Sequence, residues 1–300
     1  MGKDSTENIL EKDVLNNYNK AKSISDNVVL FAKPLVKEGA SALEITEKIE
    51  GRIKELGGGL GFPLNISVNE DAAHYTPDID DPLKFKAGDL VKIDIGVHVE
   101  GYIWDRAFTI CIGKKTHPLI KAAESGLKEA LKLIKPGTKI FEISEAVEST
   151  LEGLGFNPIR NLCGHGLDQY QQHARFSIPN GRNNIKDELQ AGQAVAMEVF
   201  ATDGVGWVKE SSPVLIYSHT QDKPVRMWEA RKILEAARDE FHRLPFAKRW
   251  LLGLKGLKLT PFKIDVALKQ LTEVESLREY PILKEESDGL VAQAEETILI

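Results

Sequence analysis

The fold of this chain is decided by residues 90–110, which read LVKIDIGVHVEGYIWDRAFTI. Apolar side chains alternate along 90–99, and 102–110 is rich in aromatic and β-branched residues, so each run predicts a strand. Only Glu100 and Gly101 separate the two runs. That spacing predicts a β-hairpin closed by a two-residue turn.

The hairpin determines which carboxylates share a face. With Val99 opposite Tyr102, Asp94 and Asp105 become diagonal neighbours on one face, roughly 7–8 Å apart at the backbone. This separation suits two carboxylates that hold metal ions roughly 3.5–4 Å apart. For this pair taken alone, two solvated aspartates on an exposed hairpin face are the favoured alternative.

Three more candidate metal ligands lie on or beside strand-like segments. His165 sits in a glycine-flanked turn, Glu198 in the apolar run 192–200, and Glu295 in 290–300. Charged residues inside apolar strands are unusual, and a buried carboxylate without a partner costs several kcal/mol. The whole set is rich in oxygen, with one imidazole and no thiolate, which suits Mn, Fe(II) or Co better than structural Zn. We therefore predict a site for two divalent cations.

An internal repeat indicates a duplicated architecture. Residues 36–50 realign on 134–148, and the sequence Gly-Leu-Gly-Phe of 59–62 recurs at 153–156. Two copies are too few for a solenoid, so we predict a duplicated helix-plus-sheet unit. The two halves would face each other across a central site, which is a common place for ligands to bind. The first half would supply the two aspartates, and the second the histidine and Glu198.

Length and composition narrow the class of protein. Three hundred residues with 42% hydrophobic content allow one large domain or two merged halves. The chain has neither an apolar run of about 18 residues nor an apolar leader, so we expect no membrane insertion or secretion. Two cysteines, Cys111 and Cys163, are too few for a disulfide framework and indicate a reducing cytoplasm. The net charge of −6 argues against general nucleic-acid binding.

Taken together, the motifs closely resemble those of methionine aminopeptidases, and more narrowly of the type 2 enzymes in their short, archaeal-like form. The matching segments are 69–77, 92–105, 164–165, 196–202 and 292–295. The resemblance runs from about Val14 to the C-terminus. It implies the α+β pita-bread fold of prolidases and creatinase, with pseudo-two-fold related halves around a dinuclear metal site. Residues 1–300 would form a single catalytic domain with a helical insertion at 222–278, in which 229–241 reads as an amphipathic helix.

The resemblance also implies roles for individual residues. The five ligands would be Asp94, Asp105, His165, Glu198 and Glu295, with Asp105 and Glu295 bridging the two metals. His74 and His173 would be catalytic and would contact the substrate, one of them donating a hydrogen bond to the developing oxyanion. The pocket for the methionine side chain would be lined by Phe62, Phe200, Tyr280 and Leu283. Glu198 would also take the proton from the attacking water and pass it to the leaving amine.

The implied function is removal of the N-terminal methionine from nascent proteins and peptides, preferentially when the next residue is small, by a metal-activated water. A cytoplasmic monomer holding Co, Mn or Fe(II), with Zn as an alternative, is expected. The basic stretch 246–255 predicts the solvent face of a helix, and a contact with the ribosome surface is left open.

Two alternatives are an Xaa-Pro aminopeptidase or dipeptidase on the same fold, and a non-catalytic pita-bread protein that binds RNA or a protein. The match around His74 and the position of the 222–278 insertion argue against the first. The presence of all five ligands argues against the second.

Five positions depart from the family pattern, and none of them is a metal ligand. They are Trp104, Arg106, Gln172, Arg175 and Glu296. The first two flank the ligand Asp105, and Glu296 follows the ligand Glu295. We expect these departures to alter the shape of the pocket and the charge around the metal site, and to leave the reaction class unchanged.

Overall fold

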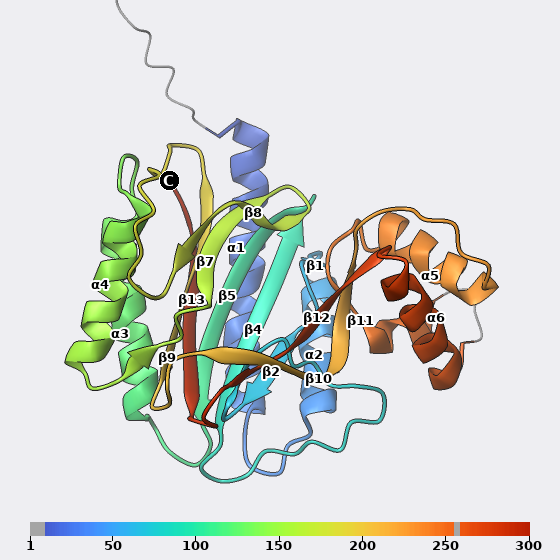
Figure 1. Ribbon diagram of the computed structural model, residues 1–300, viewed down its shortest axis with the longest axis horizontal. Coiled ribbons are helices and arrows are strands. Elements are labelled where there is room, and N and C mark those ends of the chain that lie inside the picture. The colour runs from blue at the N-terminus through green and yellow to red at the C-terminus, as the bar shows by residue number, and fades with distance from the viewer. Residues whose placement is uncertain (1–9, 255–258) are drawn as a thin grey trace, which may run out of the picture.

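The computed structural model describes residues 10–254 and 259–300, which form antiparallel sheets flanked by helices (Figure 1). The helices are α1 Lys12–Ala32, η1 Lys33–Leu35, α2 Ala42–Glu55, α3 Pro118–Leu133, α4 Ile140–Gly153, α5 Trp228–Asp239, η2 Lys248–Gly253 and α6 Pro261–Glu273. The strands are β1 Gly59–Leu60, β2 Asn65–Val68, β3 Asp71–Ala73, β4 Leu90–Val99, β5 Tyr102–Cys111, β6 Asn157–Pro158, β7 Cys163–Asp168, β8 Gln171–Pro179, β9 Ala194–Thr202, β10 Val208–His219, β11 Phe246–Ala247, β12 Leu277–Glu285 and β13 Val291–Leu299.

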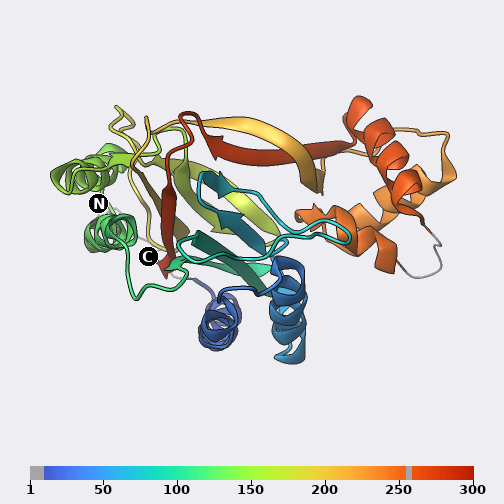
Figure 2. The same ribbon diagram turned by 90° about the horizontal axis from the view of Figure 1, so that it is seen from below.

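The first half of the molecule is built on the predicted hairpin. In it Val99 pairs with Tyr102 and Asp105 with Gly96, so the predicted register is confirmed. β4 also pairs with β1 and β2. Helices α1 and α2 bury their apolar stripes in one core with β4 and β5, and Figure 2 shows both helices below these strands.

The second half repeats this plan. Its strands lie in the order β13-β9-β7-β8, with β6 paired to β9, and α3 and α4 pack against them in a separate core. The two copies of the repeat form α2 and α4. Gly57 and Gly155, which are 98 positions apart, follow these helices with the same φ of +82°, a value that favours glycine. The predicted duplication of a helix-plus-sheet unit is confirmed.

Threonine hydroxyls join the two halves where β5 runs beside β13. Thr109 Oγ1 donates to the Gln293 carbonyl at 2.7 Å and accepts from the Gln293 N–H at 2.8 Å. Thr297 Oγ1 likewise donates to the Asp105 carbonyl at 2.8 Å and accepts from its N–H at 2.9 Å. Each hydroxyl therefore satisfies buried backbone groups that would otherwise need a ladder partner.

A third sheet, in the order β11-β10-β12-β3, leads out to the helices α5 and α6 (Figure 1). These helices share a core with β11 and η2. The amphipathic helix predicted at 229–241 is α5, which ends two residues early because His242 and Arg243 turn the chain with φ of 51° and 66°. No helix among the described residues is long and apolar enough to cross a membrane.

The prediction that the cations of 246–255 cover the solvent face of a helix is wrong for the described part of this segment. Residues 246–254 form β11 and the 3-10 helix η2. The Arg249 side chain is only 7% exposed, because it forms an ion pair with the buried Glu50 of α2. Lys248 pairs with Asp78 at 3.2 Å and with Asp265 at 2.8 Å. Through Asp78 and Glu50 these cations therefore tie segment 246–254 to the first half of the molecule; Lys255 lies outside the described residues.

Candidate active site

The predicted ligands come from five different strands and meet between the two halves. Asp94 is on β4, Asp105 on β5, His165 on β7, Glu198 on β9 and Glu295 on β13. Because strand side chains alternate between faces, each of these strands can direct one polar residue inward while its neighbours enter the apolar cores.

Three of the five approach one another most closely. Ligand atoms of Asp105, His165 and Glu295 all lie within 4.8 Å of one another. Glu198 is the direct cross-strand partner of Glu295 on β9 and β13, so these two side chains lie on the same face. Asp94 joins the group through Gln293, whose Nε2 lies 3.4 Å from Asp94 Oδ2 and 3.2 Å from Glu295 Oε2.

Burial and mutual repulsion make this arrangement costly without a cation. Burial raises the pKa of Asp94 to about 6. Burial, followed by the charge of neighbouring carboxylates, raises the pKa values of Asp105, Glu198 and Glu295 well above their ordinary range. Burial also lowers the pKa of His165 to about 3, which leaves its imidazole neutral. A neutral imidazole among carboxylates is a suitable ligand set for divalent cations.

Buried oxygens without partners give a test of that fit. Within the described residues, Asp94 Oδ1 and Asp105 Oδ1 are buried and accept no hydrogen bond. Such orphaned acceptors normally cost stability, and an ion at this point would satisfy both. The donor set and the orphaned oxygens therefore both fit a divalent metal.

Two histidines lie beside the cluster. The His173 ring stands 4.3 Å from that of His165, centroid to centroid. His74 has a φ of 66°, and its Nδ1 lies 3.1 Å from the Pro281 carbonyl. Burial lowers the pKa of each histidine to about 4, so both rings are neutral at pH 7. Because a carbonyl can only accept, His74 Nδ1 carries the proton and its Nε2 is left as an acceptor.

The predicted pocket residues surround the same region. The Phe62 ring packs on Gly96, so closely that a Cβ at Gly96 would lie 2.3 Å from it. Phe200 is fully buried in an apolar cluster that includes the half-buried Leu283. Tyr280 meets the His74 ring edge-on at 5.6 Å. Since Gly96 is the cross-strand partner of Asp105, Phe62 lies next to the ligand cluster.

Three of the departures from the family pattern compensate one another. Trp104 Nε1 donates to Glu296 at 3.0 Å, and Arg106 forms ion pairs with Glu296 at 2.7 Å and with Asp26 of α1 at 2.5 Å. Lys22 of α1 stacks over the Trp104 ring, 5.6 Å from its centroid. Arg106 and Glu296 thus neutralise each other's charge, and they do so on the side of the strands that faces α1.

The other two departures, Gln172 and Arg175, lie on β8. Arg175 has a φ of 63°, a conformation that favours glycine, and pairs with Asp168 at 2.8 Å. Gln172 lines the same cavity as His173 and Tyr280.

Sequence reasoning missed the polar residues that support the ligands. Gln293 and Thr297 flank Glu295 at spacings of two, so all three share one face of β13. The signal was present as a period-two polar pattern. The role of Gln293 and Thr297 became clear only from the residues that they face, which are Asp94 of β4 and Asp105 of β5.

Comparison with known proteins identifies the family. The model of metallopeptidase family M24 matches residues 16–223, well over half of the chain. The chain belongs to this family. The match ends where the helical segment 222–278 begins.

Relatives within family M24 agree with the resemblance of the motifs. The methionine aminopeptidase of Thermococcus onnurineus is 45% identical over 282 residues, covering 94% of each chain. That of Archaeoglobus fulgidus is 42% identical over 291 residues, covering 97% of each. Relatives at this identity and coverage place the chain among the methionine aminopeptidases of the family, which are metal-dependent hydrolases.

Solved structures agree on the fold. A thermophilic Arx1 superposes with a TM-score of 0.84 at 20% identity, covering 97% of this chain and 89% of that one. The methionine aminopeptidase of Thermotoga maritima gives a TM-score of 0.70 at 20% identity, covering 97% and 94%. At these identities the likeness concerns the fold alone, and the predicted pita-bread fold is confirmed.

Proposed function

We propose that this M24 enzyme removes the N-terminal methionine from nascent polypeptides and peptides, preferentially when the next residue is small. The observation that carries the proposal is the buried Asp105–His165–Glu295 cluster, with Asp94 and Glu198 adjoining it. Relatives at 42–45% identity that are named methionine aminopeptidases support the choice of substrate.

We propose that the five residues hold two divalent cations, Co, Mn or Fe(II), with Zn as an alternative. Four carboxylates carry four negative charges when ionised, and two divalent ions would neutralise them. Asp105 and Glu295 are proposed as the bridging ligands, since both belong to the closest group of ligand atoms. When bound, such ions lower the pKa of a water molecule and polarise a carbonyl.

The protein's own groups would divide the proton transfers. Glu198 is half-buried and lies beside Glu295, so its carboxylate can take a proton from water and return it to the leaving amine. His173 is neutral and its ring lies beside that of His165, where it can donate to the oxyanion. His74 presents an acceptor at Nε2, which suits an N–H of the substrate rather than an oxyanion.

Substrate choice would rest on the apolar groups next to the cluster. Phe62, held on Gly96, and Phe200 supply aromatic walls, and Leu283 and Tyr280 of β12 supply the others. An unbranched thioether fits such a surface without an unpaired polar atom.

We further infer that residues 1–300 act as one catalytic domain, with 222–278 as an insertion of the type 2 kind. We also propose that the enzyme works as a monomer in the cytoplasm. The two free cysteines, Cys111 and Cys163, support the reducing compartment. Contact with the ribosome remains a separate proposal. The internal ion pairs of Lys248 and Arg249 remove these two cations from the basic surface on which that idea rested.

The test uses the purified chain with a Met-Ala-Ser peptide and an Xaa-Pro peptide, after chelation and again with Mn, Fe(II) or Co restored. Metal-dependent release of methionine from the first peptide alone is the expected result. Cleavage of only the proline peptide would move the chain to the prolidase branch. For Glu198, the variant Glu198→Gln should bind metal and lose activity by about 10²–10⁴. Full activity with normal metal binding would refute the proton-transfer role.

A further inference from the structure

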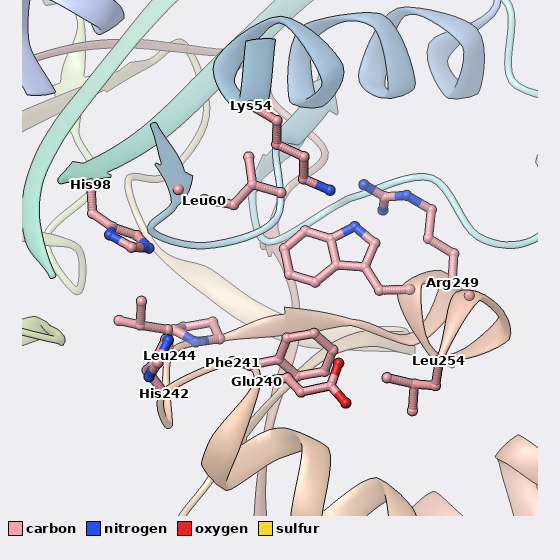
Figure 3. A pocket seen from close by; sticks show the side chains of 13 residues that line it. Lys54, Leu60, His98, Glu240, Phe241, His242, Leu244, Arg249 and Leu254 are labelled. Atoms are coloured by element: carbon pink, nitrogen blue, oxygen red, sulfur yellow. The ribbon is translucent and has the colours of Figure 1, made fainter. Parts of the chain in front are cut away.

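A cavity of about 620 Å³ lies between the insertion and the first half of the molecule (Figure 3). Its upper wall in that view carries Lys54 of α2, Leu60 of β1 and His98 of β4. The opposite wall is the segment that follows α5, including Glu240 and Phe241. We call it the insertion cavity. Its volume falls in the range that accommodates a short peptide or a drug-sized ligand.

The insertion cavity adjoins the entrance of the active site. A second cavity, of about 410 Å³, is lined by His173 and Tyr280 of the candidate active site. Both cavities are lined by His242, Leu244 and Pro245, so one short segment of the insertion forms a wall of each. A chain that leaves the active site along this side therefore meets the insertion cavity next.

Aromatic contacts fix the shape of this shared wall. The Tyr170 ring lies 5.7 Å from His98 and 4.7 Å from His242, which ties β4, the β7–β8 turn and the insertion together. His242 and Arg243 both have positive φ, and such conformations persist only when surrounding contacts impose them. The conformation of this wall is therefore fixed by its contacts with β4 and the β7–β8 turn.

The free charges of the insertion cavity lie on opposite walls. The charge of Arg249 is taken up by Glu50, and Trp250 Nε1 also donates to Glu50, at 3.0 Å. Lys54 and Glu240 are both exposed, and neither forms an ion pair within residues 10–254 and 259–300. Burial lowers the pKa of His98 to about 4, so it adds no positive charge at pH 7. Among the described lysines and arginines that line this cavity, Lys54 is thus the one without an ion pair.

We propose that the insertion cavity holds the part of the substrate polypeptide that follows its first few residues, and that Lys54 selects an acidic side chain there. This inference rests on the proposed aminopeptidase function. Shared lining with the active-site entrance supplies the route, and aromatic and aliphatic walls supply contact area. Lys54, on the wall opposite Glu240, supplies the preference for an acidic side chain along α2. Lys54 is a specificity-determining residue in this reading and takes no part in the chemistry.

The experiment compares the tripeptide Met-Ala-Ser with longer Met-Ala-Ser peptides that carry glutamates, alanines or lysines from the fifth residue onward. We expect kcat/KM to favour the acidic peptide over the basic one by about fivefold, the range of an exposed ion pair. Lys54→Glu should reverse that order. The tripeptide should be cleaved equally by both proteins.

Lys48→Glu is the matched control, because Lys48 lies on the same helix, pairs with Glu44 at 3.9 Å and does not line the insertion cavity. It changes the net charge by the same amount and should keep the acidic preference. Equal kcat/KM for all long peptides, or a preference that Lys54→Glu leaves unchanged, would overturn the proposal.

Equilibrium binding separates this proposal from the proposed function. The same long peptides, labelled at the C-terminus, are titrated with metal-loaded protein and followed by fluorescence polarisation. Failure to release methionine from the tripeptide would count against the aminopeptidase assignment. Peptide affinity that is independent of charge, or equally sensitive to Lys48→Glu and Lys54→Glu, would count against the cavity.

Discussion

The variant Glu296→Ala tests whether Trp104, Arg106 and Glu296, three of the departures from the family pattern, stabilise one another. Glu296 accepts from Trp104 at 3.0 Å and from Arg106 at 2.7 Å. Its removal leaves the indole N–H of Trp104, a side chain only 4% exposed, without its acceptor. Arg106 keeps only Asp26 of its two acidic partners.

The magnitude follows from these contacts. A hydrogen bond to a charged group contributes about 1.5–3 kcal/mol when buried. Because the Glu296 side chain is 30% exposed, we take the lower part of this range and expect a loss of about 2 kcal/mol in the free energy of unfolding. For a chain of 300 residues, with an entropy of unfolding of about 2.1 cal/mol/K per residue, that corresponds to a fall in Tm of roughly 3 °C.

The assay is urea denaturation of the chelated protein, so that metal binding does not contribute. Glu286→Ala is the control, since Glu286 is exposed and its side chain forms no ion pair in the part of the chain that the structure describes. The double-mutant cycle with Trp104→Phe, which removes the N–H together with part of the ring, should show a coupling of about 1 kcal/mol, because the packing loss is common to both backgrounds and cancels. A Glu296→Ala loss no larger than that of the control, or strict additivity in the cycle, would refute the reasoning.

Three further predictions concern the pocket, the insertion and the metal site. Gly96→Ala should displace Phe62 and cost about 1–3 kcal/mol in urea denaturation, and should raise KM for Met-Ala-Ser while metal binding is retained. Arg249→Met should leave the buried carboxylate of Glu50 without its cation and cost about 3–5 kcal/mol by the same method. Calorimetric titration should show metal affinity falling by at least about tenfold per pH unit below pH 6, because the pKa of Asp94 is raised to about 6, those of the other three carboxyls are raised as well, and each must lose its proton to bind.

The sign of the pH effect follows from the direction of the pKa shifts. The ligand carboxyls have folded-state pKa values above their unfolded values, so their protonation stabilises the chelated protein at low pH, and this contribution is lost as pH rises through the folded pKa. When metal is present, its binding to the ionised carboxylates stabilises the folded protein at higher pH and opposes this loss of stability. A metal affinity that does not change between pH 5 and 7.5 would contradict the prediction. For the other two variants, the contradicting outcomes are an unchanged KM in Gly96→Ala and unchanged stability in Arg249→Met.

Part of the fold could be predicted because its rules are local. A two-residue turn and a side-chain period of two fix which residues of β4 and β5 face each other, so the Asp94–Asp105 face followed from the sequence. The repeat predicted two similar halves, since α2 and α4 carry the same pattern of apolar residues and terminal glycines.

Contacts between distant segments could not be predicted in this way. Arg106 meets Glu296 across 190 positions of the chain, and Glu50 meets Arg249 across 199. The basic stretch at 246–255 was misjudged for this reason. A sequence pattern shows that a cation exists, whereas its burial depends on which carboxylate the fold brings to it.

The sequence by itself determined the candidate ligands, the hairpin register and the family, because these depend on residue type and on spacing along one strand or turn. Only the tertiary structure decided that Gln293 links Asp94 to Glu295, that His74 presents an acceptor, and that Thr109 and Thr297 join the two halves. The physical reason is that hydrogen bonds act within about 3 Å, and chain connectivity alone does not bring residues so far apart in sequence to that distance.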